Sequence, residues 1–103
     1  MVTHLVSWKF RADIPAEDRI RIGKELSEAF PALVGKIPGL LKVRFFAPPL
    51  ASSTCDMALY CELEKESDIA VYAQHPEHLK VAAVVRANCE GRCAVDFPAE
   101  EER

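Results

Sequence analysis

The feature that most constrains the fold is the alternation of apolar and polar residues in four separate stretches of the chain. The clearest stretch is residues 2–10, in which every second position is Val2, His4, Val6, Trp8 or Phe10. Shorter alternating stretches occupy residues 41–47, 57–63 and 92–97. A period of two places neighbouring side chains on opposite faces of a strand, so four strands are predicted. His4 is expected on the apolar face of the first.

Helical spacing fills two of the intervals between these strands. Asp13 and Pro15 form a helix start, and apolar residues then recur at helical spacing to about residue 36, with Pro31 expected to bend the helix. Ser67 is expected to cap a short helix that ends near residues 74–75, and a further helix is expected from Pro76 to about residue 88. The apolar positions of the first helix are Ile22, Leu26, Phe30, Leu33 and Ile37.

The order strand, helix, strand, strand, helix pair, strand defines a βαββαβ chain of the α+β class. This is the ferredoxin-like plan, an antiparallel four-stranded sheet with helices on one face. We predict a single domain over residues 1–97, followed by a charged tail over residues 98–103. A length of 103 residues suits one domain of this kind.

The two faces of the predicted sheet differ in composition. One face is uniformly apolar and is expected to lie under the helices: Val6, Trp8, Val43, Phe45, Leu59 and Val95. The other mixes apolar residues with charged ones: Leu5, Leu40, Phe46, Ala58, Tyr60 and Ala94 among Lys9, Lys42, Arg44 and Asp96. Because so much apolar area on a second face is better buried than left in water, we predict a homodimer that packs sheet against sheet.

Charge and cysteine content narrow the class of partner. With 13 basic and 16 acidic side chains the net charge is −3, which disfavours nucleic acid and anionic membranes as partners. The first residues lack a basic segment followed by a continuous apolar core, so no signal peptide is expected and the predicted compartment is the cytoplasm. There the four cysteines are expected to be reduced, small apolar residues rather than disulfides.

Residues 72–78, Tyr-Ala-Gln-His-Pro-Glu-His, concentrate the polar chemistry of the chain. Pro76 forces an elbow between two helices and places His78 in the first turn of the second, where the positive end of the helix dipole favours a neutral imidazole. A neutral histidine can act as a general base, and the Tyr72 hydroxyl can donate to a carbonyl or enolate oxygen. Both residues are therefore candidate catalytic groups, although a kinked elbow also forms for packing alone.

A small-molecule cavity is expected between the sheet and this elbow. Its predicted substrate-binding residues are polar groups from strand and elbow within an apolar ring: His4, Val6, Trp8, Phe30, Leu59 and His75. A purely structural role for His4, Trp8 and Phe30 remains open. Zinc binding by the three histidines is a weaker alternative, because the proline between His75 and His78 fixes no shared ligand face. No metal and no cofactor is predicted.

Five pieces of the sequence together resemble one known family. They are Val2-x-His4-Leu5-Val6-x-Trp8-Lys9-Phe10, Ile37-Pro38-Gly39-Leu40, Asp56, Tyr72-x-x-His75-Pro76-x-His78 and Val95-Asp96-Phe97. In this order they resemble the stress-responsive α/β-barrel (Dabb) family. The resemblance covers nearly the whole chain and implies a ferredoxin-like subunit that dimerises through its sheet into an α+β barrel.

The resemblance also implies candidate roles but leaves the activity open. One enzymatic branch, the plant olivetolic acid cyclases, closes a polyketide without a cofactor, using a histidine base and an assisting tyrosine. Matched through the elbow motif, these roles fall on His78 and Tyr72, with His4 beside the cavity. The alternative is a non-catalytic, stress-associated structural or ligand-holding dimer. A haem or oxygenase member of the wider group is disfavoured, since no residue pattern specifies an axial ligand.

Overall fold

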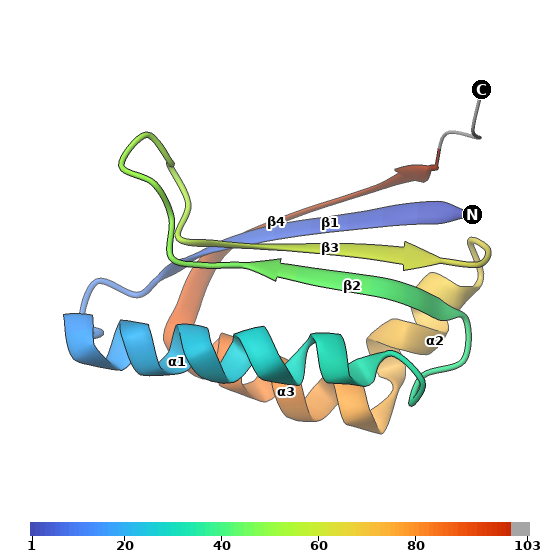
Figure 1. The fold of residues 1–103 in the computed structure, drawn as a ribbon, viewed down its shortest axis with the longest axis horizontal. Helices are drawn as coiled ribbons and strands as arrows, with labels where there is room; N and C mark the ends of the chain where they lie inside the picture. Colours follow the sequence, from blue (N-terminus) through green and yellow to red (C-terminus); the bar gives the residue numbers. More distant parts are fainter. Residues whose placement is uncertain (100–103) are drawn as a thin grey trace.

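The computed structural model describes residues 1–99. Figure 1 shows one sheet with all the helices on one of its faces. The elements in chain order are β1 (Val2–Phe10), α1 (Ala16–Ala29), the short 3-10 helix η1 (Pro31–Leu33), β2 (Leu40–Phe46), β3 (Met57–Leu63), α2 (Asp68–Gln74), α3 (Pro76–Asn88) and β4 (Cys89–Pro98).

The sheet has the order β2-β3-β1-β4, and every neighbouring pair of strands is antiparallel. β1 therefore lies inside the sheet between β3 and β4, while β2 and β4 are the edges. This arrangement confirms the predicted ferredoxin-like βαββαβ fold. Its consequence for the site is that β1, which carries His4, forms part of the floor beneath the helices.

Two prolines set the ends of the helices. α1 ends at Ala29, and Pro31 opens a separate 3-10 turn, so the expectation of one bent helix reaching residue 36 is wrong. Pro31 cannot supply the amide hydrogen that an α-helix needs at that position. At the second proline the prediction is confirmed: His75 adopts an extended conformation (φ −67°, ψ 134°), and Pro76 is the first residue of α3.

The core lies between the sheet and the helical layer. Val6, Trp8 and Phe10 from β1 are buried on the helix-facing side, as the alternation predicts. The ring of Phe30 stacks on that of Trp8 with centroids 6.0 Å apart and on that of Phe45 at 5.5 Å. Aromatic rings packed in this way contribute more than their area alone, so this stack anchors the end of α1 to the sheet.

The faces of β4 are the reverse of the prediction. Val95 pairs with Leu5, Ala94 with Val6 and Asp96 with His4. Directly paired residues of antiparallel strands share a face, so Val95 lies on the outer side and Asp96 on the helix side. The alternation of β4 is as predicted, but both faces of the sheet carry apolar residues, and a period of two does not decide which face each residue takes.

The prediction that Leu40 lies on the outer face is also wrong. It pairs with Leu63 on the helix side and is buried, whereas Leu41 is exposed. The register shifts between Leu40 and Lys42, and such a bulge turns the side chains before it to the other face.

The two ends of the described chain lie together. Pro98 pairs with Val2, and the Ala99 amide donates to the Met1 carbonyl at 3.0 Å. β4 thus includes the first residue of the predicted tail, and residues 100–103 of that tail lie outside the described residues. Within residues 1–99, no helix has the length and apolar character needed to cross a membrane.

Candidate functional site at the helix elbow

The elbow joins α2 to α3 through His75. This residue caps α3: its Nδ1 accepts a hydrogen bond from the Glu77 amide at 3.1 Å. An N-cap side chain satisfies an amide that has no partner inside the helix. The structure therefore gives His75, a predicted substrate-binding residue, a definite role in holding the bend that positions Tyr72 and His78.

Tyr72 lies between the other two histidines. Its side chain is buried, with the residue 2% exposed, and its ring centroid is 4.3 Å from that of His78 and 5.7 Å from that of His4. Three of the predicted site residues, from β1, α2 and α3, are thus brought into one group. We call His4, Tyr72, His78 and their partner Asp96 the elbow cluster.

Burial fixes the protonation of the Tyr72 hydroxyl. Desolvation raises its pKa well above the ordinary value, and the neighbouring Cys61 raises it further. The Cys61 thiol donates to the hydroxyl oxygen at 4.0 Å, and its own pKa is raised to about 12, mainly by burial. Both groups stay protonated near neutral pH, so the hydroxyl is a hydrogen-bond donor and not a base.

His78 is half-buried and has a defined tautomer. Its Nδ1 lies 3.1 Å from the Ala73 carbonyl oxygen. A carbonyl can only accept, so Nδ1 carries the hydrogen and Nε2 of the neutral ring is left as the acceptor. Burial lowers the pKa of His78, although the bond to Ala73 acts against it. Sequence reasoning expected a neutral imidazole from the helix dipole; desolvation is the larger cause.

His4 is buried, and its Nδ1 lies 2.5 Å from Oδ1 of Asp96. The carboxylate keeps 40% of its side chain exposed at the edge strand. An aspartate that accepts from Nδ1–H fixes the ring orientation and leaves Nε2 as the free nitrogen. Sequence reasoning missed Asp96 because it placed this residue on the outer face; the register between β1 and β4 is the signal that finds it.

Four further predicted residues are deeply buried core side chains. Trp8 and Phe30 stack on each other, and Val6 and Leu59 pair across β1 and β3. All four are at most 6% exposed.

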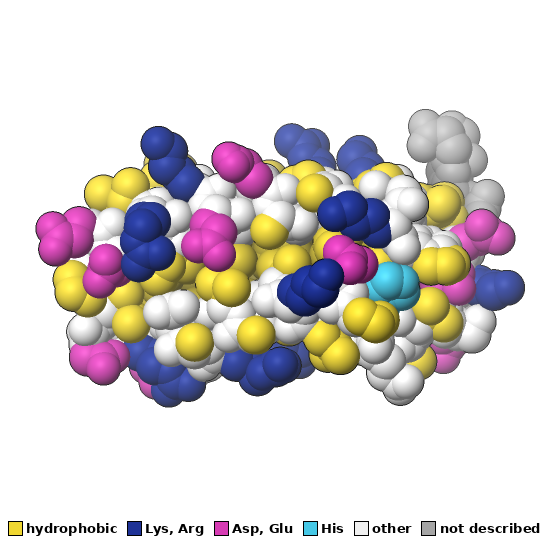
Figure 2. All heavy atoms as spheres, turned by 90° about the horizontal axis from the view of Figure 1, so that it is seen from below, with side chains coloured by type: hydrophobic (Ala, Val, Ile, Leu, Met, Phe, Trp, Pro, Cys, Tyr) yellow, Lys and Arg dark blue, Asp and Glu magenta, His cyan; other side chains and the backbone are white. Residues whose placement is uncertain are grey.

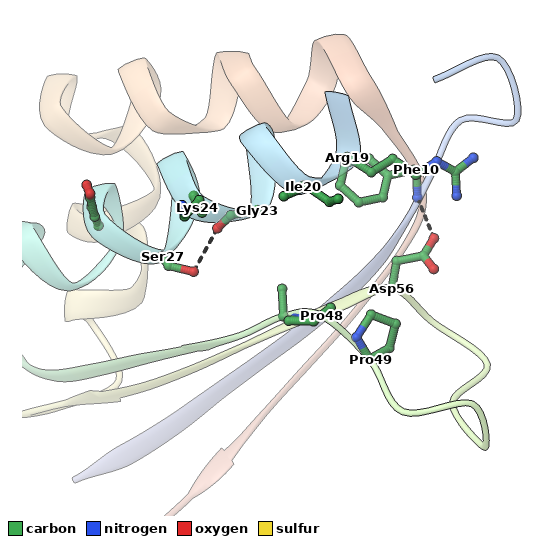
Figure 3. Close-up of a pocket in the computed structure, with 11 residues that line it drawn as sticks. Phe10, Arg19, Ile20, Gly23, Lys24, Ser27, Pro48, Pro49 and Asp56 are labelled. Atoms are coloured by element: carbon green, nitrogen blue, oxygen red, sulfur yellow. Dashed lines mark hydrogen bonds between the residues drawn. The ribbon is translucent and has the colours of Figure 1, made fainter. Parts of the chain in front are cut away.

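A separate hollow of about 550 Å³ lies along α1, next to the connection from β2 to β3, and none of the predicted site residues lines it (Figure 3). Among residues 1–99, no three His, Cys, Asp or Glu side chains gather as metal ligands.

Residues 2–99 match the model of the Stress responsive A/B Barrel Domain, Dabb. The chain belongs to the Dabb family. The match covers every element of the fold, from β1 to β4, and confirms the resemblance seen in the sequence. A search among curated proteins finds no significant match.

Solved structures show the same fold. A dimeric ferredoxin-like protein of unknown function from Bacteroides fragilis is 32% identical, with 95% of each chain covered and a TM-score of 0.89. SnoaB, a cofactor-independent oxygenase from Streptomyces nogalater, is 12% identical over 98% of this chain and 94% of its own, with a TM-score of 0.68. The hydroxynitrile lyase of Passiflora edulis is 13% identical over 99% and 95%, with a TM-score of 0.74. The two distant structures support the fold alone.

Proposed function

We propose that this Dabb protein binds a small carbonyl compound at the elbow cluster and transfers protons on it without a cofactor. The observation that carries the proposal is the contact of Tyr72 with His78, which joins an obligatory hydrogen-bond donor to a neutral imidazole. A base and an electrophilic donor side by side are what removal of a proton next to a carbonyl requires.

In the proposed step, Nε2 of His78 takes a proton from the carbon next to the substrate carbonyl. The electron pair of that C–H bond forms a carbon–carbon double bond to the carbonyl carbon, the π pair of the carbonyl moves to its oxygen, and the resulting enolate oxygen is held by the Tyr72 hydroxyl. Because this hydroxyl accepts from Cys61, its own hydrogen stays available to donate. The same imidazole then returns the proton.

The half-exposed side of the elbow cluster is the proposed route for substrate. On β4, all residues after Cys89 are exposed, including those on the helix side, so the helices leave this edge strand uncovered. The Asp96 carboxylate on β4 is 40% exposed and His78 is half-buried, whereas Tyr72 is buried. A ligand that approaches over β4 reaches the imidazole first.

The proposed functional unit is a homodimer. The outer sheet face carries Val95 and Phe97, which are 49% and 44% exposed, with Leu5 of β1 next to Val95. Phe46 of β2 is exposed on the same face at the opposite edge of the sheet. Because Val95 lies on this face and not on the helix side, the exposed apolar area is larger than the sequence indicated. An exposed apolar area of this kind is unusual on a monomer. The dimeric relative from Bacteroides fragilis supports the assembly, and free cysteines support a reducing compartment such as the cytoplasm.

A non-catalytic, ligand-holding or structural dimer is the second candidate. Deep burial of Tyr72 and the packed stack of Trp8 on Phe30 favour it, since neither arrangement requires a substrate. The names of two distant relatives, an oxygenase without cofactor and a lyase, support chemistry on this fold but not a particular reaction.

The test is exchange of the α-hydrogens of small ketones and phenolic ketones into deuterium oxide, followed by NMR. The wild-type protein is expected to accelerate exchange for at least one compound, and His78→Ala to abolish it. His75→Asn is the matched control, because asparagine also caps a helix and should keep the bend. Exchange that survives in His78→Ala refutes the catalytic role, and no acceleration with any carbonyl compound favours the non-catalytic dimer.

A further inference from the structure

The hollow beside α1 is built from a second, independent set of residues. One wall is a stripe along α1, and the other is the turn that leaves β2 at Pro48 and Pro49 (Figure 3). Phe10, at the end of β1, also lines it. Its volume of about 550 Å³ falls within the roughly 300–1,000 Å³ of typical ligand pockets.

Gly23 makes room for this hollow. A Cβ built at Gly23 would lie 3.8 Å from the Cβ of Ala47, an ordinary contact, so a larger side chain there would occupy the space between helix and turn. Glycine inside a helix is less stable than alanine, because glycine loses more backbone freedom on folding. Alanine would fit without a clash, so packing alone gives no reason for glycine. On the same stripe Ile20 is 68% exposed, an apolar side chain with nothing to cover it.

The charged side chains that line the hollow differ in whether they have partners within the protein. Arg19 donates through Nε to the Ile14 carbonyl at 2.8 Å and lies over the Phe10 ring, and Asp56 accepts from the Phe10 amide at 2.8 Å. Lys24 forms no ion pair within the part of the chain that the structure describes. A second nitrogen of Arg19, Nη2, donates to the Arg11 carbonyl at 3.2 Å, so this guanidinium is held at the end of the hollow next to Phe10 and Asp56, and Lys24 supplies the positive charge nearer the middle. Glu28, a turn further along, makes the other end unfavourable for a second anionic group.

We propose that this hollow binds a small, mainly apolar molecule with a single carboxylate, such as an aryl- or alkylcarboxylic acid. The apolar body lies between Gly23, Ile20 and the two prolines, and the carboxylate meets Lys24. This site shares no residue with the elbow cluster, so it does not depend on the proposed reaction. Figure 2 shows the helical face, where hydrophobic side chains gather along the middle between rows of charged ones.

The probes for the test are 4-phenylbutyrate and its uncharged analogue 4-phenyl-1-butanol, titrated into the full chain by calorimetry at low salt. The acid is expected to bind more tightly than the alcohol and to shift the amide NMR signals of Gly23, Ala47 and Asp56. Lys24→Gln should weaken binding of the acid by about fivefold to tenfold and leave the alcohol unchanged. Arg21→Gln is the matched control: it removes a positive charge from the same helix but outside the hollow.

Two variants test whether the ligand occupies the hollow. Gly23→Leu should fill the hollow and abolish binding, and Ser27→Phe should do the same from an exposed helix position that leaves the core intact. The proposal is overturned if the acid binds no better than the alcohol or not at all. It is equally overturned if Lys24→Gln and Arg21→Gln have the same effect, or if the shifts map to Tyr72 and His78 and vanish in His78→Ala.

Discussion

Adding a single methyl group at Gly39, just before β2, should destabilise the elbow between α2 and α3. Its φ of +84° lies in the left-handed region, and a Cβ built on it would come within 2.6 Å of Oδ1 of Asp68. Asp68 is the buried first residue of α2, and its Oδ2 accepts from the Lys65 amide at 3.1 Å. Gly39→Ala therefore forces away the side chain that fixes the start of the helix carrying Tyr72.

The size of the effect follows from two separate costs. Left-handed backbone costs a non-glycine residue about 1–2 kcal/mol. Displacing Asp68 removes a partly buried hydrogen bond, which adds about 1–3 kcal/mol. Gly39→Ala should thus lose about 2–5 kcal/mol of unfolding free energy. Gly35→Ala is the matched control: Gly35 also has positive φ (+91°), but nothing lies within 4 Å of its added Cβ, so it should lose only the first amount.

Urea unfolding followed by circular dichroism, at one fixed protein concentration, measures these differences. In the double variant Gly39→Ala/Asp68→Ala the clash is gone, so the loss should be smaller than the sum of the two single losses. Equal losses for Gly35→Ala and Gly39→Ala, or strict additivity in the double variant, would refute the steric argument.

Four further outcomes follow from the fold and the site. Burial lowers the pKa of His78 in the folded protein, so the unfolded chain binds the proton more readily. The free energy of unfolding should therefore fall as the pH drops below about 6.5, and it should fall less in His78→Gln. Urea midpoints measured from pH 7 to 5 give this difference. Asp96→Asn should cost at most about 1 kcal/mol, since the carboxylate is partly exposed, but should change the ¹⁵N NMR shifts of the His4 ring. Val95→Asp should convert the proposed dimer to a monomer in light scattering after gel filtration, because it places a charge on the apolar outer face; an unchanged dimer mass would contradict that interface. Phe30→Ala should lose about 3–5 kcal/mol by thermal or urea unfolding, since the ring is 1% exposed and stacked on two others.

The sequence by itself determined the order of elements, the buried side of β1 and the bend at Pro76. Each of these depends on interactions within a short segment: a period of two along a strand, or the missing amide hydrogen of a proline. His4, Tyr72 and His78 could be named as candidates in this way, because their residue types and their places on predicted elements are local properties.

Only the tertiary structure decided which residues meet. Asp96 reaches His4 because of the register between β1 and β4, strands that are far apart in the sequence, and no local pattern encodes that register. The side on which Val95 lies could not be predicted for the same reason, since both faces of this sheet carry apolar residues. The hollow at Gly23 likewise exists only where α1 meets the turn after β2, so it depends on packing between segments rather than on either segment alone.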